Sequence, residues 1–418
     1  MKKKVTIHID GKIIRAEEGN NLLQTAIENG INIPNLCYHR KLSPTGACRM
    51  CITKISGMKG YVTSCSTVIS DGMQVVAFDE ELEQERRNIL DLLLSEHNEH
   101  YDYSYEDSFS VLTKRYGLDD KKARKHPRIE VQYDSPVDDS SPVLSYDASK
   151  CIKCFRCIKA CSEVQGKNVL NFAERGIRSY IVAGTGTWSD SECDGCGECI
   201  QLCPTGAIME KPHRKKYPTE KIERRVITTC PYCGVGCQLE LHIRKGKIIR
   251  VTGLEGVLPN DGRLCIKGRF GYEYVNSPDR LTSPLIRKNG RFVKASWDEA
   301  LNLIAKKFLE IRKKYGSNAL AGYSSAKCTN EDNYIFQKFI RIAFGTNNMD
   351  YCTRLCHAST VTAMLKSIGD GAGSNSIEDF EETECLFVTG NNIIETHPVT
   401  ATYVKRGAAK GMKIIVCD

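Results

Sequence analysis

The spacing of the cysteines is the strongest constraint on how this chain folds. The chain has 418 residues and 21 cysteines, and sixteen of these fall into four groups separated by short gaps. In a small secreted protein, such a count would indicate disulfides. Here the short gaps are repeated, and the basic start Met1–Lys4 is followed by an alternating strand pattern instead of a signal peptide. The spacing therefore predicts reduced or metal-bound thiols.

Two of the groups share the pattern C-x2-C-x2-C-x3-C and lie about forty residues apart, with Pro204 after the second. This run is typical of bacterial ferredoxins, in which the fourth cysteine crosses to the other [4Fe–4S] cluster. We therefore predict one cluster at Cys151, Cys154, Cys157 and Cys203, and another at Cys193, Cys196, Cys199 and Cys161. Two zinc knuckles are the alternative, which the spacing argues against.

The first group has gaps of ten, two and thirteen residues and consists of Cys37, Cys48, Cys51 and Cys65. Thiolates are soft, anionic ligands that suit iron. With the flanks Tyr38-His39-Arg40 and Gly46–Cys51, the group resembles the [2Fe–2S] module of the large iron–sulfur subunit of respiratory complex I. A hairpin pattern over 4–16, with a turn at Asp10-Gly11, and a helix pattern from Leu22 favour a β-grasp ferredoxin. A structural zinc site is the alternative.

The fourth group, followed by the flank Gly262–Gly268, consists of Cys230, Cys233, Cys237 and Cys265. It resembles the [4Fe–4S] entry domain of the molybdopterin oxidoreductases. In that family a lysine two residues after the last cysteine lies between cluster and pterin, and Lys267 occupies this position. The resemblance implies an electron-relay role for Lys267; an ordinary surface lysine is the alternative.

The stretch Gly345–His357 resembles formate dehydrogenase alpha subunits. The resemblance places Cys356 as the ligand of molybdenum or tungsten and His357 as a group that assists proton or hydride transfer. A soft thiolate suits a high-valent metal, and imidazole titrates near neutral pH. The remaining cysteines have no partners in spacing and are expected to be buried core thiols: Cys328, Cys352, Cys385 and Cys417.

Residues 385–417 have the pattern of a βαβ unit, whose first turn is Gly390-Asn391-Asn392 and whose second strand ends before Asp418. Such a turn can present N–H groups to phosphate, and an acid after the next strand can hold a ribose or guanine. In the family this region contacts one guanine dinucleotide arm of the pterin. A plain strand-to-helix turn is the equal alternative.

Many relatives carry a further cluster with ligands His-x3-Cys-x2-Cys-x5-Cys. When this template is aligned with the chain at His97, its three cysteine positions are occupied by Tyr101, Ser104 and Ser110. Hydroxyl oxygens are hard, poor substitutes for thiolate. We therefore expect no cluster here, and expect His97 and His100 to be surface or structural residues.

The predicted fold class is an α+β front end, made of a β-grasp ferredoxin and a 2×[4Fe–4S] ferredoxin-like domain, followed by the start of an α/β molybdopterin oxidoreductase fold. Residues 79–117 have a helical pattern, residues 118–148 read as an irregular connector, and Ser296 and Glu299 predict a capped helix over 297–315. The expected domains are 1–78 ([2Fe–2S]), 79–148 (helical and connector segment with the degenerate histidine-and-cysteine cluster site), 149–210 (2×[4Fe–4S]), 226–282 (molybdopterin oxidoreductase [4Fe–4S]) and 283–418 (incomplete start of the molybdopterin-binding domain).

The bulk composition excludes other classes. The net charge is +8 and the Lys and Arg residues are spread along the chain, which does not favour nucleic-acid binding. The chain contains no run of about 18 apolar residues, so the sequence predicts no membrane-spanning helix. We expect a cytoplasmic protein.

The resemblance implies one [2Fe–2S] cluster, three [4Fe–4S] clusters and a Mo- or W-bis(molybdopterin guanine dinucleotide). It covers essentially all of this chain but only the first part of a formate dehydrogenase alpha subunit, so we expect either a fragment or a split subunit. The implied partners are the remainder of the molybdopterin domain and an electron acceptor: an NAD(P)-reducing flavoprotein, a ferredoxin or a hydrogenase.

Other interpretations account for part of the pattern. An electron-transfer-only subunit of a complex I-like or hydrogenase-type assembly would share the front modules, but would not be expected to keep Cys356-His357. A periplasmic-type nitrate reductase lacks the ferredoxin front end, and an iron-only hydrogenase needs adjacent cysteines, which this chain lacks.

Overall fold

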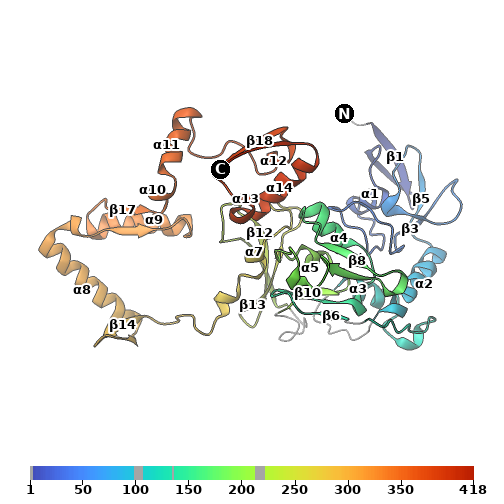
Figure 1. The fold of residues 1–418 in the computed structure, drawn as a ribbon, viewed down its shortest axis with the longest axis horizontal. Coiled ribbons are helices and arrows are strands. Elements are labelled where there is room, and N and C mark those ends of the chain that lie inside the picture. Colours follow the sequence, from blue (N-terminus) through green and yellow to red (C-terminus); the bar gives the residue numbers. More distant parts are fainter. Residues whose placement is uncertain (1–2, 98–106, 134–135, 212–221) are drawn as a thin grey trace. The chain divides into compact units, whose positions relative to one another are not determined.

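The computed structural model describes residues 3–97, 107–133, 136–211 and 222–418. The chain forms two compact units (Figure 1). The first comprises Met1–Tyr272 together with Phe380–Asp418, and the second comprises Glu273–Asp379. The predicted succession of α+β modules and an α/β segment is confirmed.

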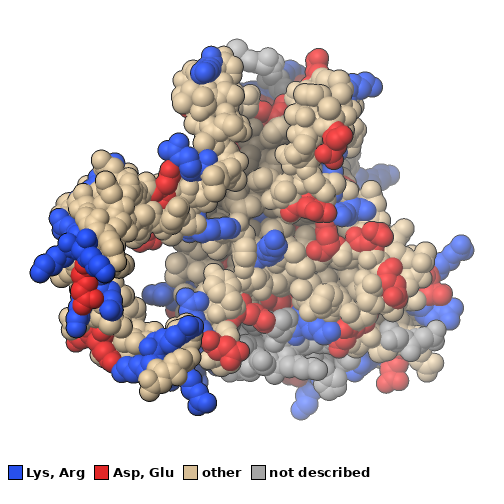
Figure 2. All heavy atoms as spheres, turned by 60° about the vertical axis from the view of Figure 1, so that its left-hand side comes forward, with Lys and Arg blue, Asp and Glu red and all other residues tan. Residues whose placement is uncertain are grey.

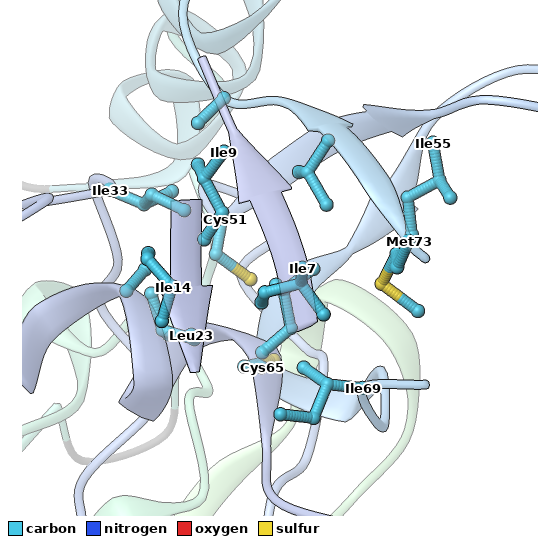
Figure 3. Close-up of a cluster of buried hydrophobic side chains, with 14 of the residues drawn as sticks. Ile7, Ile9, Ile14, Leu23, Ile33, Cys51, Ile55, Cys65, Ile69 and Met73 are labelled. Carbon is cyan, nitrogen blue, oxygen red and sulfur yellow. The ribbon is translucent and has the colours of Figure 1, made fainter. Parts of the chain in front are cut away.

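The first unit begins with a five-stranded sheet in the order β2-β1-β5-β3-β4. Its elements are β1 (Lys4–Ile9), β2 (Lys12–Glu17), α1 (Leu22–Glu28), β3 (Ile52–Ile55), β4 (Val62–Thr63) and β5 (Gln74–Val76). The predicted hairpin is confirmed, because β1 and β2 pair antiparallel around the turn at Asp10 and Gly11, both with positive φ. Figure 3 shows Cys51 and Cys65 among the aliphatic side chains of this core.

Two helices follow, α2 (Glu80–Glu96) and α3 (Ser108–Arg115), as the helical pattern predicts. Asp79 caps α2 by accepting from the N–H of Leu82 at 2.7 Å. The fully buried Arg86 ties α2 to the sheet. Its guanidinium donates to the carbonyl oxygens of Ile52 at 2.6 Å and Ala77 at 2.7 Å.

We expect Arg86→Met to lower the free energy of local unfolding around β3 by about 3 kcal/mol, because two buried carbonyls lose their donor. Methionine fills a similar volume, so the loss comes mainly from the polar contacts. Amide hydrogen exchange in β3 measures this free energy. Arg15→Met, on the exposed side of β2, is the control. Equal protection in the two variants would contradict the role of Arg86.

The second module holds the two ferredoxin-like runs. Its elements are β6 (Val137–Asp138), β7 (Leu144–Asp147), α4 (Arg156–Lys159), β8 (Leu170–Ala173), β9 (Tyr180–Ala183), α5 (Glu198–Leu202) and β10 (Ile208–Glu210). The expectation of an irregular connector through residue 148 is wrong at its end. Residues 137–147 contain two strands of the sheet β10-β7-β6, since pairing with β10 supplies their hydrogen bonds.

A third module is an antiparallel sheet of β11 (Arg224–Thr229), β12 (Gln238–Arg244) and β13 (Lys247–Gly253), followed by α7 (Ile266–Phe270). The last segment of the chain packs on this module within the first unit. It contains α12 (Asp379–Glu382), β18 (Cys385–Thr389), α13 (Ile393–Thr396), α14 (Pro398–Ala409) and β19 (Lys413–Cys417). Arg263 donates to the hydroxyl of Thr402 in α14 at 3.0 Å. The strands β18 and β19 are parallel, so the predicted βαβ unit is confirmed.

The second unit contains β14 (Leu285–Lys288), β15 (Arg291–Lys294), α8 (Trp297–Tyr315), β16 (Gly322–Ser324), α9 (Asn330–Phe339), β17 (Met349–Tyr351), α10 (Thr353–Cys356) and α11 (Ala358–Ser367). The predicted helix over 297–315 is confirmed, with Ser296 accepting from the N–H of Glu299 at 3.1 Å. Much of its apolar face is exposed, including Leu301 at 55%.

Charged side chains of both signs are mixed over the visible face of the molecule (Figure 2). Within the described ranges, none of the helices has the length and apolar character that crossing a membrane requires.

Candidate metal centres

The cysteines of the first group lie where two hydrophobic cores meet. Cys51 precedes β3, Cys65 lies in the helical turn after β4, and both belong to the core of the sheet. Cys37 and Cys48 come from the loop between α1 and β3 and belong to the neighbouring core around α2. The backbone N–H of Cys37 lies 3.4 Å from Sγ of Cys48. All four side chains are buried.

Contacts among these thiols shift their pKa values. Hydrogen bonds with Cys48 and Cys65 lower the pKa of Cys37 to about 2, and a hydrogen bond with Cys65 lowers the pKa of Cys51. The hydrogen bond with Cys37 raises the pKa of Cys48. Thiols exchange hydrogen bonds only when they are in contact, so the four side chains form one group. Four soft donors in one buried group fit a [2Fe–2S] cluster.

The second centre combines both ferredoxin-like runs. One cavity is lined by four cysteines that belong to the predicted crossed set, Cys151, Cys154, Cys157 and Cys203. Its other walls are mainly apolar, and Ile152 and Ile208 are among them. Burial raises the pKa of Cys151 to about 11 and that of Cys154 further. Buried thiols of this kind become stable thiolates when they bind a metal, and their arrangement fits a [4Fe–4S] cluster.

We expect Cys203→Ser to remove the cluster of the first run, although Cys203 belongs to the second run in sequence. The reason is that its side chain lines the cavity of Cys151, and a serine oxygen binds iron weakly. Electron paramagnetic resonance should lose one [4Fe–4S] signal, the same one that Cys154→Ser removes. Loss of the signal that depends on Cys196 would contradict the crossed assignment.

The third centre is the other crossed set. Burial and the nearby Cys196, Cys193 and Cys161 raise the pKa of Cys199, so these four thiols are neighbours. The second and third centres adjoin, because α4 carries Cys157, α5 carries Cys199, and both side chains belong to one hydrophobic core. Figure 1 shows α4 and α5 in the same part of the first unit.

The fourth centre is a cavity lined by the last cysteine group, Cys230, Cys233, Cys237 and Cys265. Pro398 and Val399 at the start of α14 form another wall. Burial, together with the other three thiols, raises the pKa of Cys237 to about 12. The enclosed set of four thiols fits a [4Fe–4S] cluster. Lys267 is exposed on the first turn of α7, directly after Cys265.

The four centres form a contiguous series within the first unit. Arg269, in the helix that follows Cys265, donates to the carbonyl oxygen of Cys196 at 2.8 Å and so joins the fourth centre to the third. At the other end, Cys154 of the second centre shares a hydrophobic core with Cys37 and Cys48 of the first. In the part of the chain that is described, no three His, Cys, Asp or Glu side chains are grouped so as to hold a single metal ion.

Cys356 and His357 belong to the second unit. They follow β17, which pairs in parallel with β16, so they lie beyond the carboxyl end of a parallel strand pair. Ligands of α/β proteins bind at this edge. Both side chains are exposed, and His357 separates α10 from α11.

The expectation that the four unassigned cysteines are buried core thiols is wrong. Cys352 and Cys328 lie in the exposed loops after β17 and β16, and Sγ of Cys352 accepts from the N–H of Ala326 at 3.3 Å. Cys385 and Cys417 lie in β18 and β19, a two-stranded sheet that leaves these side chains exposed.

The candidate pterin contacts Gly390 and Asp418 lie at the same edge of the β18–β19 pair. The N–H of Gly390 donates to the carbonyl of Cys417 at 3.0 Å, so it serves the strand pairing instead of being free for phosphate. Asn391 and Asn392 are exposed in the turn. Asn392 directly precedes α13, a helix of a single turn.

His97 is buried, not on the surface. The centroid of its ring lies 4.8 Å from that of Phe109, with the two rings tilted. Ser110, the residue after Phe109, is also buried. His100, Tyr101 and Ser104, the other positions of the degenerate template, lie outside the described residues.

Four known families match successive parts of the chain. Residues 2–79 match the 2Fe-2S iron-sulfur cluster binding domain, residues 141–209 the ferredoxin-like domain of NADH-quinone oxidoreductase subunit 3, residues 223–277 the molybdopterin oxidoreductase Fe4S4 domain, and residues 280–418 molybdopterin oxidoreductase. The chain therefore contains, in order, a 2Fe-2S domain, a ferredoxin-like domain, an Fe4S4 domain and a molybdopterin oxidoreductase domain. The resemblance of its modules to these families is confirmed.

The chain is similar to several curated proteins and one solved structure. It is 35% identical over 392 residues to the NADPH–Fe(3+) oxidoreductase subunit alpha of Geobacter sulfurreducens, covering 92% of this chain and 44% of that protein. It is 32% identical to a Staphylococcus aureus protein provisionally named formate dehydrogenase, and the match covers 100% of this chain and 46% of that protein. The structure of an NAD+-reducing [NiFe]-hydrogenase matches with 29% sequence identity and a TM-score of 0.47. The match covers 53% of this chain and 92% of the hydrogenase chain. The chain thus spans less than half the length of these curated relatives.

Proposed function

We propose that this chain is the iron–sulfur and metal-ligating part of a molybdenum- or tungsten-dependent formate dehydrogenase. The reaction converts formate to carbon dioxide, two electrons and a proton, in either direction. The observation that carries the proposal is the contiguous series of four cysteine centres in a chain that also holds Cys356 and His357 after a parallel strand pair.

The bis-pterin metal would accept the two electrons of formate, and the residues of this chain would hold it and conduct the electrons away. Cys356 would ligate the metal through its thiolate, and the imidazole of His357 would take up the proton. Gly390, Asn391, Asn392 and Asp418 would lie near one guanine dinucleotide arm. Lys267, two residues after Cys265, would place a positive charge on the path from pterin to cluster.

Electrons would enter at the Cys230 centre and pass through the third and second centres to the [2Fe–2S] centre. An electron-accepting partner would take them there: an NAD(P)-reducing flavoprotein, a ferredoxin or a hydrogenase. We place the protein in the cytoplasm, where such acceptors work. The remainder of the molybdopterin domain would complete the substrate pocket.

An electron-transfer subunit without formate chemistry is the second candidate. The 35% identity to a protein named NADPH–Fe(3+) oxidoreductase subunit alpha favours it, because that name specifies a different donor and acceptor.

Rapid mixing of the complete protein with formate distinguishes the two candidates. If the proposal is right, formate reduces the iron–sulfur clusters within a catalytic turnover and molybdenum or tungsten is present. If NADPH with its flavoprotein reduces the clusters and formate does not, the electron-transfer candidate is right. Molecular oxygen must be excluded, because it would oxidise the reduced clusters.

A further inference from the structure

Three modules of the first unit meet at a buried network of charges. Its centre is Glu198, which lies between Cys196 and Cys199 and is 1% exposed. Lys41 of the [2Fe–2S] module lies 2.8 Å from one carboxylate oxygen of Glu198. Arg269 of the molybdopterin oxidoreductase [4Fe–4S] module lies 3.5 Å from the other.

Both cations are nearly as buried as the carboxylate. The Lys41 side chain is 7% exposed and that of Arg269 is 2% exposed. Lys41 also contacts Glu255 at 3.0 Å, but the side chain of Glu255 is 34% exposed and partly screened by water. The buried part of the network therefore holds two positive charges against one negative charge.

Arg269 places this excess positive charge against the backbone of the third centre. Its Nε donates to the carbonyl oxygen of Cys196 at 2.8 Å, and a terminal nitrogen donates to Gln201 at 2.7 Å. Gly197 makes the approach possible: its φ is +72°, and a Cβ there would collide with Cδ of Arg269. The guanidinium group thus lies against the backbone of the predicted ligand Cys196 and of the next residue, Gly197.

Structural stability alone is a weak reason for such a network, because removing ions from water offsets most of their mutual attraction. A fixed charge beside a redox centre has a second effect. A [4Fe–4S] cluster gains one electron on reduction, without forming or breaking a bond, and its potential depends on nearby charges and hydrogen bonds. In a buried site these charges act with little screening.

We infer that Arg269 and Glu198 are positioning residues that set the reduction potential of the cluster held by Cys161, Cys193, Cys196 and Cys199. Arg269 stabilises the reduced cluster and raises its potential, and Glu198 lowers it. This cluster receives one electron from the Cys230 centre and passes it to the second centre. The inference rests on the proposed cluster assignment.

Redox titration of the intact protein, monitored by electron paramagnetic resonance, tests the inference. Arg269→Gln should disfavour reduction of this cluster at least tenfold, which corresponds to about −59 mV for a one-electron couple. Glu198→Gln should shift the potential in the opposite direction. Arg269→Lys keeps the positive charge, so its cluster should have a reduction potential close to that of the wild type. Glu174→Gln, an exposed carboxylate of the same module, is the control and should shift nothing.

Opposite shifts in the two variants, largest at this cluster, would support the inference, because a purely structural role predicts no such reversal of sign. Shifts no larger than in the control, or in the same direction in both variants, would overturn it. If Arg269→Gln does not fold, the shift in potential of Glu198→Gln compared with that of Glu174→Gln still tests the inference. If the wild type lacks the signal that Cys196→Ser should remove, the cluster assignment itself is wrong, which is a distinguishable failure.

Discussion

A Cys356→Ser variant of the complete enzyme is expected to lose formate oxidation by more than about 100-fold while all four iron–sulfur clusters remain. Residues that merely support a metal ligand typically cost about 10–100-fold, so loss of the ligand itself should cost more. A serine hydroxyl does not replace a soft thiolate on a high-valent metal. Cys356 belongs to none of the four cysteine groups and lies in the second unit, so the clusters should be unaffected.

Formate-dependent dye reduction, metal analysis and cluster signals should be measured together on this variant. Cys352→Ser is the matched control, because Cys352 is another exposed thiol, directly before the helix α10 that ends at Cys356. The control should retain activity. A fully active Cys356→Ser enzyme would favour the electron-transfer candidate or place the metal ligand elsewhere.

The second large effect is expected from Cys237→Ser, which removes a ligand of the Cys230 centre. Cys237 is buried with three other cysteines in one cavity, and its replacement by a weak oxygen ligand should abolish that cluster. Formate would then still reach the metal, but its electrons would have no route to the front clusters. We expect formate-driven reduction of those clusters to fall by more than about 100-fold.

Freeze-quench spectroscopy measures this loss directly, and dithionite should still reduce the three remaining clusters. Tyr232→Phe is the control, because Tyr232 lines the same cavity without being a ligand. Unchanged reduction of the front clusters by formate in Cys237→Ser would show that electrons bypass the Cys230 centre.

Local sequence signals predicted much of this structure. The Asp10-Gly11 hairpin, the helix after Ser296 and the final βαβ unit depend on turn chemistry and on periodicity that a short window contains. The position of Cys203 in one cavity with Cys151, Cys154 and Cys157 was also predictable, because the ferredoxin run indicates which cysteines come together.

Other features depend on long-range packing. Strands β6 and β7 were expected to be irregular because prolines and charges surround them, and only pairing with the distant β10 makes them strands. Exposure of Cys385 and Cys417 follows from the small number of neighbouring strands, which sequence spacing does not encode.

The charge network was missed for a similar reason. Lys41, Glu198 and Arg269 are far apart in sequence, and each reads alone as an ordinary surface charge. One partial signal was available: Glu198 lies between two predicted cluster cysteines, and a carboxylate that is buried at such a position requires a cation.

Iron analysis combined with electron paramagnetic resonance on the anaerobically purified protein tests the central claim most directly. Sixteen cysteines in four centres predict about fourteen irons per chain, with one [2Fe–2S] and three [4Fe–4S] signals. A value near ten would mean that one of the three cubane centres holds no cluster. A value near eighteen, with a fourth [4Fe–4S] signal, would mean that the segment after His97 binds a cluster and would contradict the account.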